Sequence, residues 1–148
     1  MALIEKINQD LIEAQKSKNE IVVGTLRMLK AAITNFNIAT RKELDDSDIA
    51  TVLQKEIKTR NESAEVFKRG NRPELAEKEE KEIEILKVYL PEQISDDEIR
   101  ARASEIIAKE NLKGVENMGK VIGQLMAEFK GKAQGGTVSQ IVKEELTK

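Results

Sequence analysis

Glycine and lysine residues near the end of the chain have a spacing that could bind phosphate. Residues 114–121 read GVENMGKV, which matches the phosphate-binding loop pattern G-x-x-x-x-G-K-[S/T] at every position except the last. The hydroxyl residue that would hold Mg²⁺ is replaced by Val121, and Glu116 would place a negative charge where backbone amides should face phosphate. The segment before Gly114 has a helical pattern rather than that of a strand. These departures argue against a nucleotide-binding loop.

The glycines of this region have structural explanations and one functional alternative. Gly119 and Gly123 lie four residues apart on one predicted helix face, which would let another backbone approach closely. Gly131 is predicted to cap a helix C-terminus. Gly135 and Gly136 are expected to form a hinge before Thr137, which with Gln140 has the spacing of a capping box. Helix ends, a hinge and close helix packing explain these glycines. The alternative is that they form an exposed backbone surface that contacts a partner.

Three lysines lie beside these glycines and could follow a phosphate backbone. They are Lys120, Lys130 and Lys132. Basic residues also outnumber acidic ones between residues 27 and 72, ten to seven, whereas acidic residues dominate from 74 to 98, ten to three. The alternative explanation of these charges is a set of solvated helix faces. The net charge of −2 does not by itself indicate a nucleic-acid-binding protein.

Arg60 is the charged residue with the most unusual position. It falls on the apolar seam of a predicted helix, three residues after Ile57. A charge there must pair, extend to solvent or face a cleft. Glu56 lies four residues earlier and can form an intrahelical ion pair, which is the structural explanation. The functional alternative is a ligand-facing cleft that contains Arg27, Lys58 and Arg60.

The composition excludes several kinds of chemistry. The chain has 148 residues and contains neither cysteine nor histidine, so it cannot form a disulfide, a zinc site of the usual kind or a Ser-His or Cys-His nucleophile pair. The acidic run at 74–85 lacks the loop spacing of calcium sites. The N-terminal MALIEKINQDLIEAQ is too charged for a signal peptide or a membrane span. We therefore expect no metal, no cofactor, no membrane contact and a cytoplasmic location.

Helical elements must position all of these residues. Apolar residues step by three and four in every segment, and aromatic residues make up only 3% of the chain, which is typical of an all-α protein. We predict an N-terminal four-helix domain at 1–90 and a three-helix C-terminal domain at 95–148, with a joint at LPEQIS. Expected N-terminal caps are Asn19, one of Asp45, Asp46 and Ser47, Asn71 with Glu74, and Ser95 with Glu98; Gly70 is expected to follow a helix end.

Several motifs in order give the chain a family resemblance. NMGKVIGQLMAEFKGKAQGGTVSQIVKEEL resembles the C-terminal tail motif of the GatB/YqeY family, and TLRMLKAAI, KEIKTRNESAEVF and EIEILKVYLPEQIS resemble the body of free-standing YqeY proteins. The resemblance implies the same division into four and three helices. It also implies kinship with the tail of the GatB component of the Asp/Glu-tRNA amidotransferase, a carbon–nitrogen ligase with glutamine as amido-N-donor. In that family the tail contacts tRNA, while catalysis lies in other domains.

The resemblance implies a non-catalytic accessory protein that contacts tRNA through its C-terminal module. The contacting residues would be Gly119, Lys120, Gly123, Lys130, Gly131 and Lys132. One departure affects this expectation: the family turn Gly-Arg-Ala-Asp-Gly is Gly-Lys-Ala-Gln-Gly at 131–135, which removes the bidentate guanidinium and the acidic residue. The alternative function is a protein–protein adaptor without an RNA ligand. An independent enzyme is a third class, for which no catalytic constellation is visible.

Overall fold

The chain folds into two groups of α-helices joined by a short connection. The computed structural model describes residues 2–148, among which seven α-helices and one 3₁₀ turn are present and no strand occurs. The prediction of an all-α protein is therefore confirmed. The chain divides into two compact units, Met1–Leu90 and Pro91–Lys148, which we call the N-terminal and C-terminal units. Each unit has its own hydrophobic core.

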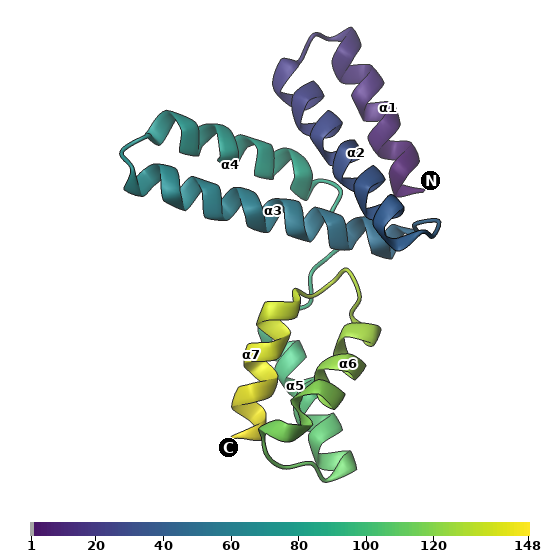
Figure 1. The fold of residues 1–148 in the computed structure, drawn as a ribbon, viewed down its shortest axis with the longest axis vertical. Coiled ribbons are helices and arrows are strands. Elements are labelled where there is room, and N and C mark those ends of the chain that lie inside the picture. Colours follow the sequence, from purple (N-terminus) through teal and green to yellow (C-terminus); the bar gives the residue numbers. More distant parts are fainter. Residues whose placement is uncertain (1) are drawn as a thin grey trace. The chain divides into compact units, whose positions relative to one another are not determined.

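The N-terminal unit consists of two helical hairpins, which Figure 1 shows as α1–α2 and α3–α4. Its helices are α1 (Leu3–Lys16), α2 (Glu20–Thr40), α3 (Asp46–Arg69) and α4 (Pro73–Lys87). The predicted seams supply the core, in which Ile7, Leu26, Leu29, Leu53 and Leu86 are fully buried. Because the aliphatic residues recur every three or four positions, each helix buries one stripe against its neighbours.

The C-terminal unit is a bundle of three helices (Figure 1). It contains α5 (Asp96–Glu110), the 3₁₀ turn η1 (Val115–Asn117), α6 (Met118–Glu128) and α7 (Gly135–Leu146). Its core is made by Ile99, Ala103, Val121, Leu125, Val138 and Val142, all at most 1% exposed. None of the helices in the described part of the chain combines the length and apolar character needed to cross a membrane.

Several predicted helix caps are confirmed. Asp45 begins α3 with a full capping box, in which its carboxylate accepts from the Asp48 N–H at 2.9 Å and the Asp48 carboxylate accepts from the Asp45 N–H at 3.2 Å. Ser95 accepts from the Glu98 N–H at 3.2 Å, and Asn19 accepts from the Val22 N–H at 3.5 Å. These short polar side chains satisfy amides that the first helical turn leaves unpaired.

Two predicted caps are wrong. Asn71 does not cap α4; it lies in the left-handed region with φ of 58°, whereas Gly70, which follows the end of α3 as predicted, has φ of −84°. Thr137 does not start α7 either, because the helix already begins at Gly135. Asparagine tolerates the left-handed conformation better than most residues. Gly135 and Gly136 belong to α7 and do not adopt that conformation.

Candidate functional site

The exposed face of α6 carries the first group of predicted contact residues. Gly119 and Gly123 lie on this face, and a Cβ atom built on either would meet nothing within 4 Å. The pair therefore does not serve close packing inside the C-terminal unit, which was the structural explanation offered by the sequence. A bare stretch of helix backbone faces outward instead.

Lys120 lies on the same face but is engaged within the unit. Its Nζ is 3.1 Å from Glu110 Oε1, and the Gln124 amide donates to Glu110 Oε2 at 2.8 Å. The Gln124 hydrogen bond and then the Lys120 ammonium lower the pKa of Glu110. Because the lysine side chain is 55% exposed, solvent ions compete with this ion pair. The Lys120 ammonium group is therefore accessible from solvent.

The start of α6 offers less to an anion than its sequence indicates. The η1 turn runs directly into the helix, so the Asn117 N–H donates to Gly114 O at 3.2 Å and the Met118 N–H donates to Val115 O. Two amides near the first turn thus have partners inside the chain. Any attraction for phosphate at Lys120 depends mainly on the ammonium group and the bare helix face.

The second predicted group follows the end of α6 in a tightly held turn. The Lys132 N–H donates to Phe129 O and the Ile94 N–H donates to Lys132 O, both at 2.8 Å. Gly131 has φ of 78°, a conformation that favours glycine, and its carbonyl accepts from the Gln93 amide at 3.1 Å. The backbone of Gly131 is buried rather than exposed, so its role is to shape the turn that carries Lys130 and Lys132.

These two groups lie at opposite ends of α6. Gly119 and Lys120 are in its first turn, whereas Lys130 and Lys132 follow its last residue, Glu128. Eleven helical residues separate the ends by roughly 16 Å at about 1.5 Å per residue. A ligand that contacts both groups must therefore be extended, as a nucleic-acid backbone is.

Arg60 forms the intrahelical ion pair that was one of the two explanations for its position on the apolar seam. The side chain of this residue is buried, with Nη1 2.7 Å from Glu56 Oε2 and Nε 3.0 Å from Glu82 Oε2. Burial lowers the pKa of Arg60, but its hydrogen bonds to the two carboxylates outweigh that effect and raise it. The predicted Glu56–Arg60 pair is confirmed, and Glu82 on α4 is a second partner that the sequence did not reveal.

The predicted cleft residues do not gather around Arg60. Lys58 is exposed on α3, whereas Arg60, two residues further on, is buried. Arg27 lines a surface hollow beside Lys18 and Gly24, at the start of α2. Arg60 lines neither this hollow nor the one between α2 and α3. This placement favours the ion-pair explanation for Arg60.

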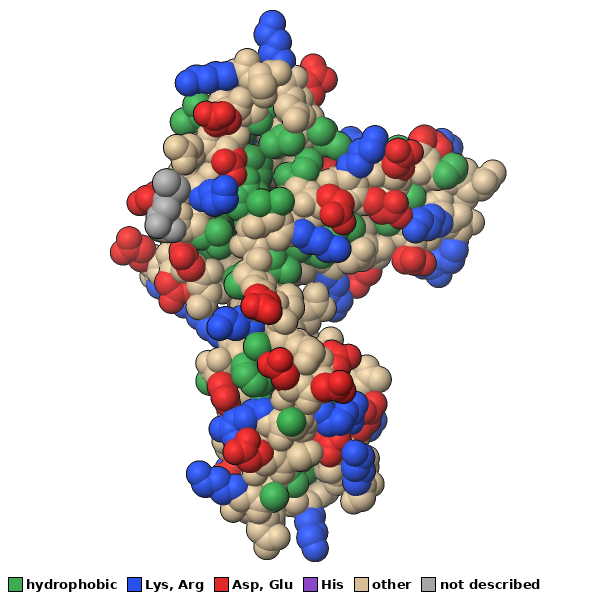
Figure 2. Space-filling view, turned by 180° about the vertical axis from the view of Figure 1, so that it is seen from behind, with side chains coloured by type: hydrophobic (Ala, Val, Ile, Leu, Met, Phe, Trp, Pro, Cys, Tyr) green, Lys and Arg blue, Asp and Glu red, His purple; other side chains and the backbone are tan. Residues whose placement is uncertain are grey.

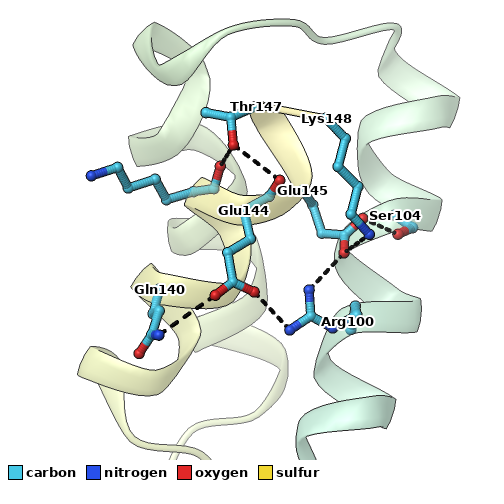
Figure 3. A network of polar contacts seen from close by, with 8 residues as sticks. Arg100, Ser104, Gln140, Glu144, Glu145, Thr147 and Lys148 are labelled. Carbon is cyan, nitrogen blue, oxygen red and sulfur yellow. Dashed lines mark hydrogen bonds and ion pairs between the residues drawn. The ribbon is translucent and has the colours of Figure 1, made fainter.

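The C-terminal unit also contains a polar network that no sequence motif predicted (Figure 3). Arg100 on α5 donates to Glu144 and Glu145 on α7, each at 2.8 Å. Glu145 also accepts from Ser104 at 3.0 Å and from Lys148 at 2.9 Å. Hydrogen bonds from Arg100 first, and then from Lys148, lower the pKa of Glu145 to about 2. The α5 and α7 partners are 41 to 45 positions apart, so no local spacing could reveal them.

Comparison with known proteins identifies relatives along nearly the whole chain. Residues 4–146 match the family model described as Yqey-like protein. The chain is 30% identical over 137 residues to altered inheritance of mitochondria protein 41, mitochondrial, of Pyrenophora tritici-repentis, covering 88% of this chain and 73% of that protein. Proteins of the same name from Lachancea thermotolerans and Clavispora lusitaniae are 35% and 32% identical, each over 72% of this chain and over 58% and 63% of their own lengths.

These relatives contradict the expected cytoplasmic location. Each of the three is named as a mitochondrial protein. The expectation rested on the absence of cysteine and on the charged N-terminal segment, and neither feature specifies a compartment.

Proposed function

The chain belongs to the YqeY-like protein family, and from that premise we propose that it is a non-catalytic accessory protein of tRNA-dependent amidotransferase biology, which contacts tRNA through its C-terminal unit. The link to the amidotransferase rests on the resemblance of residues 117–146 to the tail of its GatB component. The observation that carries the RNA contact is the bare face of α6, where Gly119 and Gly123 flank Lys120 and a Cβ built on either glycine would meet nothing within 4 Å.

The chemistry of this face suits a phosphate backbone. Glycine lets phosphate oxygens come close to the helix, and Lys120 can exchange Glu110 for a phosphate because the pair is exposed. Lys130 and Lys132 extend the contact to the other end of α6. Lysine contacts to phosphate carry no sequence information, so we expect micromolar or weaker affinity with little sequence readout.

Titration of labelled tRNA into the protein at two salt concentrations tests this proposal. We expect Lys120→Gln, Lys130→Gln and Lys132→Gln together to weaken binding and to flatten its salt dependence by about one unit of slope for each lysine that no longer meets a phosphate. The matched control carries glutamine in place of three exposed lysines elsewhere, Lys81, Lys109 and Lys143. It should bind tRNA as the parent does. Because the relatives are named as mitochondrial, mitochondrial tRNA belongs among the probes.

A second variant distinguishes an effect on tRNA binding from an effect on stability. Gly119→Ala and Gly123→Ala should raise stability by about 1 kcal/mol each, since both glycines lie within a helix with open space around them. The added methyl groups should nevertheless weaken tRNA binding. Equal affinity of the parent and the lysine variant, or no binding by the parent at low salt, would remove the RNA proposal.

A protein–protein adaptor is the second candidate function. The observation that favours it is the exposure of large apolar side chains in the N-terminal unit, including Met28 at 55%, Ile38 at 68% and Val88 at 67%. Where such side chains form a contiguous patch, they mark a site of contact with other proteins. Salt distinguishes the two functions, because phosphate contacts weaken steeply with salt and an apolar interface does not.

A further inference from the structure

A groove on the N-terminal unit combines an apolar floor with an acidic rim. It has a volume of about 480 Å³ and is lined by residues of α1, of the start of α2, and of the end of α4 with the turn that follows it. The lining residues are Gln9, Asp10, Glu13, Ala14, Ser17, Val22, Ile85, Val88 and Tyr89. Figure 2 shows hydrophobic side chains gathered on a face of this unit, in the angle between the α1–α2 and α3–α4 hairpins.

The apolar part of the groove is open to a partner. Val88 is 67% exposed although it belongs to the groove wall, and Ile85 and Val22 are half-buried. Covering large apolar side chains that are exposed in a concave surface is favourable, because the free energy falls in proportion to the apolar area removed from water. The floor therefore favours an apolar side chain of the partner.

The charged residues that line the groove are all acidic. Asp10 and Glu13 are its ionisable carboxylates, and no lysine or arginine is among the nine lining residues. Tyr89 donates its hydroxyl proton to Asp10 Oδ2 at 2.6 Å, which fixes that carboxylate at the edge of the apolar floor. Glu13 is exposed and receives no such contact from a lining side chain.

Lys6 provides an intramolecular example of the group that this rim accepts. Its Nζ lies 3.3 Å from Asp10 Oδ2 and 5.8 Å from the centre of the Tyr89 ring. An ammonium group is thus already held at one end by a carboxylate and an aromatic face. The other end, at Glu13 and Ser17, has the same negative charge without a cation among its lining residues.

We propose that this groove, between α1 and α4, docks a helix of a protein partner that presents apolar side chains next to lysine or arginine. Along α1 the groove runs from Gln9 to Ser17, roughly 12 Å, which matches about two turns of a partner helix. Apolar residues three or four positions apart would cover Val88 and Ile85, and a cation one turn away would meet Glu13. The site lies in the N-terminal unit and does not depend on the proposed RNA contact.

The test uses three synthetic helical peptides of equal length and the isotopically labelled full chain. The first peptide has leucines at i, i+4 and i+7 flanked by lysines, the second has glutamates in place of the lysines, and the third has alanines in place of the leucines. We expect the first to shift backbone amide resonances of the groove and to bind about tenfold more tightly than the second, because like charges repel. The third should bind more weakly than the first because it covers less apolar surface.

Variants of the chain locate the contact. Glu13→Gln, which leaves the apolar floor intact, should weaken binding of the lysine peptide about threefold. Val88→Glu should weaken it by more than about tenfold, since a charge would be placed against the apolar face. The controls are Glu62→Gln and Val66→Glu, both exposed on α3 outside the groove, and they should bind as the parent does.

Three results of the peptide titrations would overturn the proposal. They are equal affinity for the lysine and glutamate peptides, resonance shifts that lie outside the groove, and unchanged binding by Val88→Glu. A tRNA titration that shifts the groove amides more strongly than the peptide does would also overturn it, because the occupant would then be a nucleic acid.

Discussion

At the scale of single residues, Arg60 shows how far a sequence pattern can lead. A charge on an apolar seam signals a special environment, and Glu56 at the i−4 position gave half of that environment. The other half, Glu82, lies 22 residues away on α4 and required the packing of the hairpin. Local spacing predicts intrahelical partners, whereas partners across helices depend on the tertiary structure.

Replacing Arg60 with methionine should destabilise the protein strongly. The substitution leaves the carboxylates of Glu56 and Glu82 without their cation, and breaking a buried ion pair from one side costs about 3 kcal/mol. Urea unfolding followed by circular dichroism measures this destabilisation.

Lys58→Met is the matched control for this prediction. Lys58 lies on the same helix but is exposed, so its replacement should change the free energy of unfolding by less than about 0.5 kcal/mol. The double variant Arg60→Met with Glu82→Met should recover part of the stability, since no buried carboxylate then remains on α4. An Arg60→Met protein as stable as the parent but unable to bind a partner would instead assign Arg60 to a ligand site.

At the scale of elements, apolar periodicity was a better guide than helix-end chemistry. The seams at Ile7, Leu26 and Leu53 became core because burial of a continuous stripe outweighs local preferences. The ends were less predictable, since several residues compete for one capping position: Asp45 was selected from three candidates, and Asn71 took a left-handed turn conformation instead of capping α4. The groove residues were missed because they come from three helices and share no motif.

The network that joins α5 and α7 should make stability depend on pH. The pKa of Glu145 is depressed to about 2 in the folded chain, below the ordinary value of about 4.3 for glutamate. Its contribution is therefore complete above about pH 4.3 and disappears as the pH falls toward about 2. Melting temperatures measured by circular dichroism between these pH values should fall more steeply for the parent than for Glu145→Gln.

Glu92→Gln serves as the control for the acid titration. Glu92 is exposed in the connection between the units, so its replacement should leave the pH profile of the parent unchanged. Parallel profiles for the parent and Glu145→Gln would show that the contacts of Arg100 and Lys148 with Glu145 do not contribute to stability in solution.

At the scale of the whole molecule, the two units have cores formed from separate stretches of sequence, so we expect each unit to fold by itself. The core at Ile7 to Tyr89 and the core at Ile99 to Leu146 share no residue. Charge is also close to balanced over the whole chain, with 25 basic and 27 acidic residues. Recognition of a partner must therefore come from local surfaces such as the α6 face and the α1–α4 groove rather than from an overall electrostatic field.

The connection between the units should be the first site of limited proteolysis. A protease specific for glutamate meets many exposed glutamates on helices, where backbone hydrogen bonds resist the extended conformation that cleavage requires. Glu92 is exposed and lies outside every helix, between Lys87 and Asp96. Glu43 is also exposed, between α2 and α3, but the residue after it, Leu44, packs against the core of the N-terminal unit. We expect the first cut after Glu92, with both fragments retaining their helical circular dichroism and their amide spectra. Early cleavage inside α2 or α3, or unfolding of either fragment after release, would show that the two units depend on each other for stability.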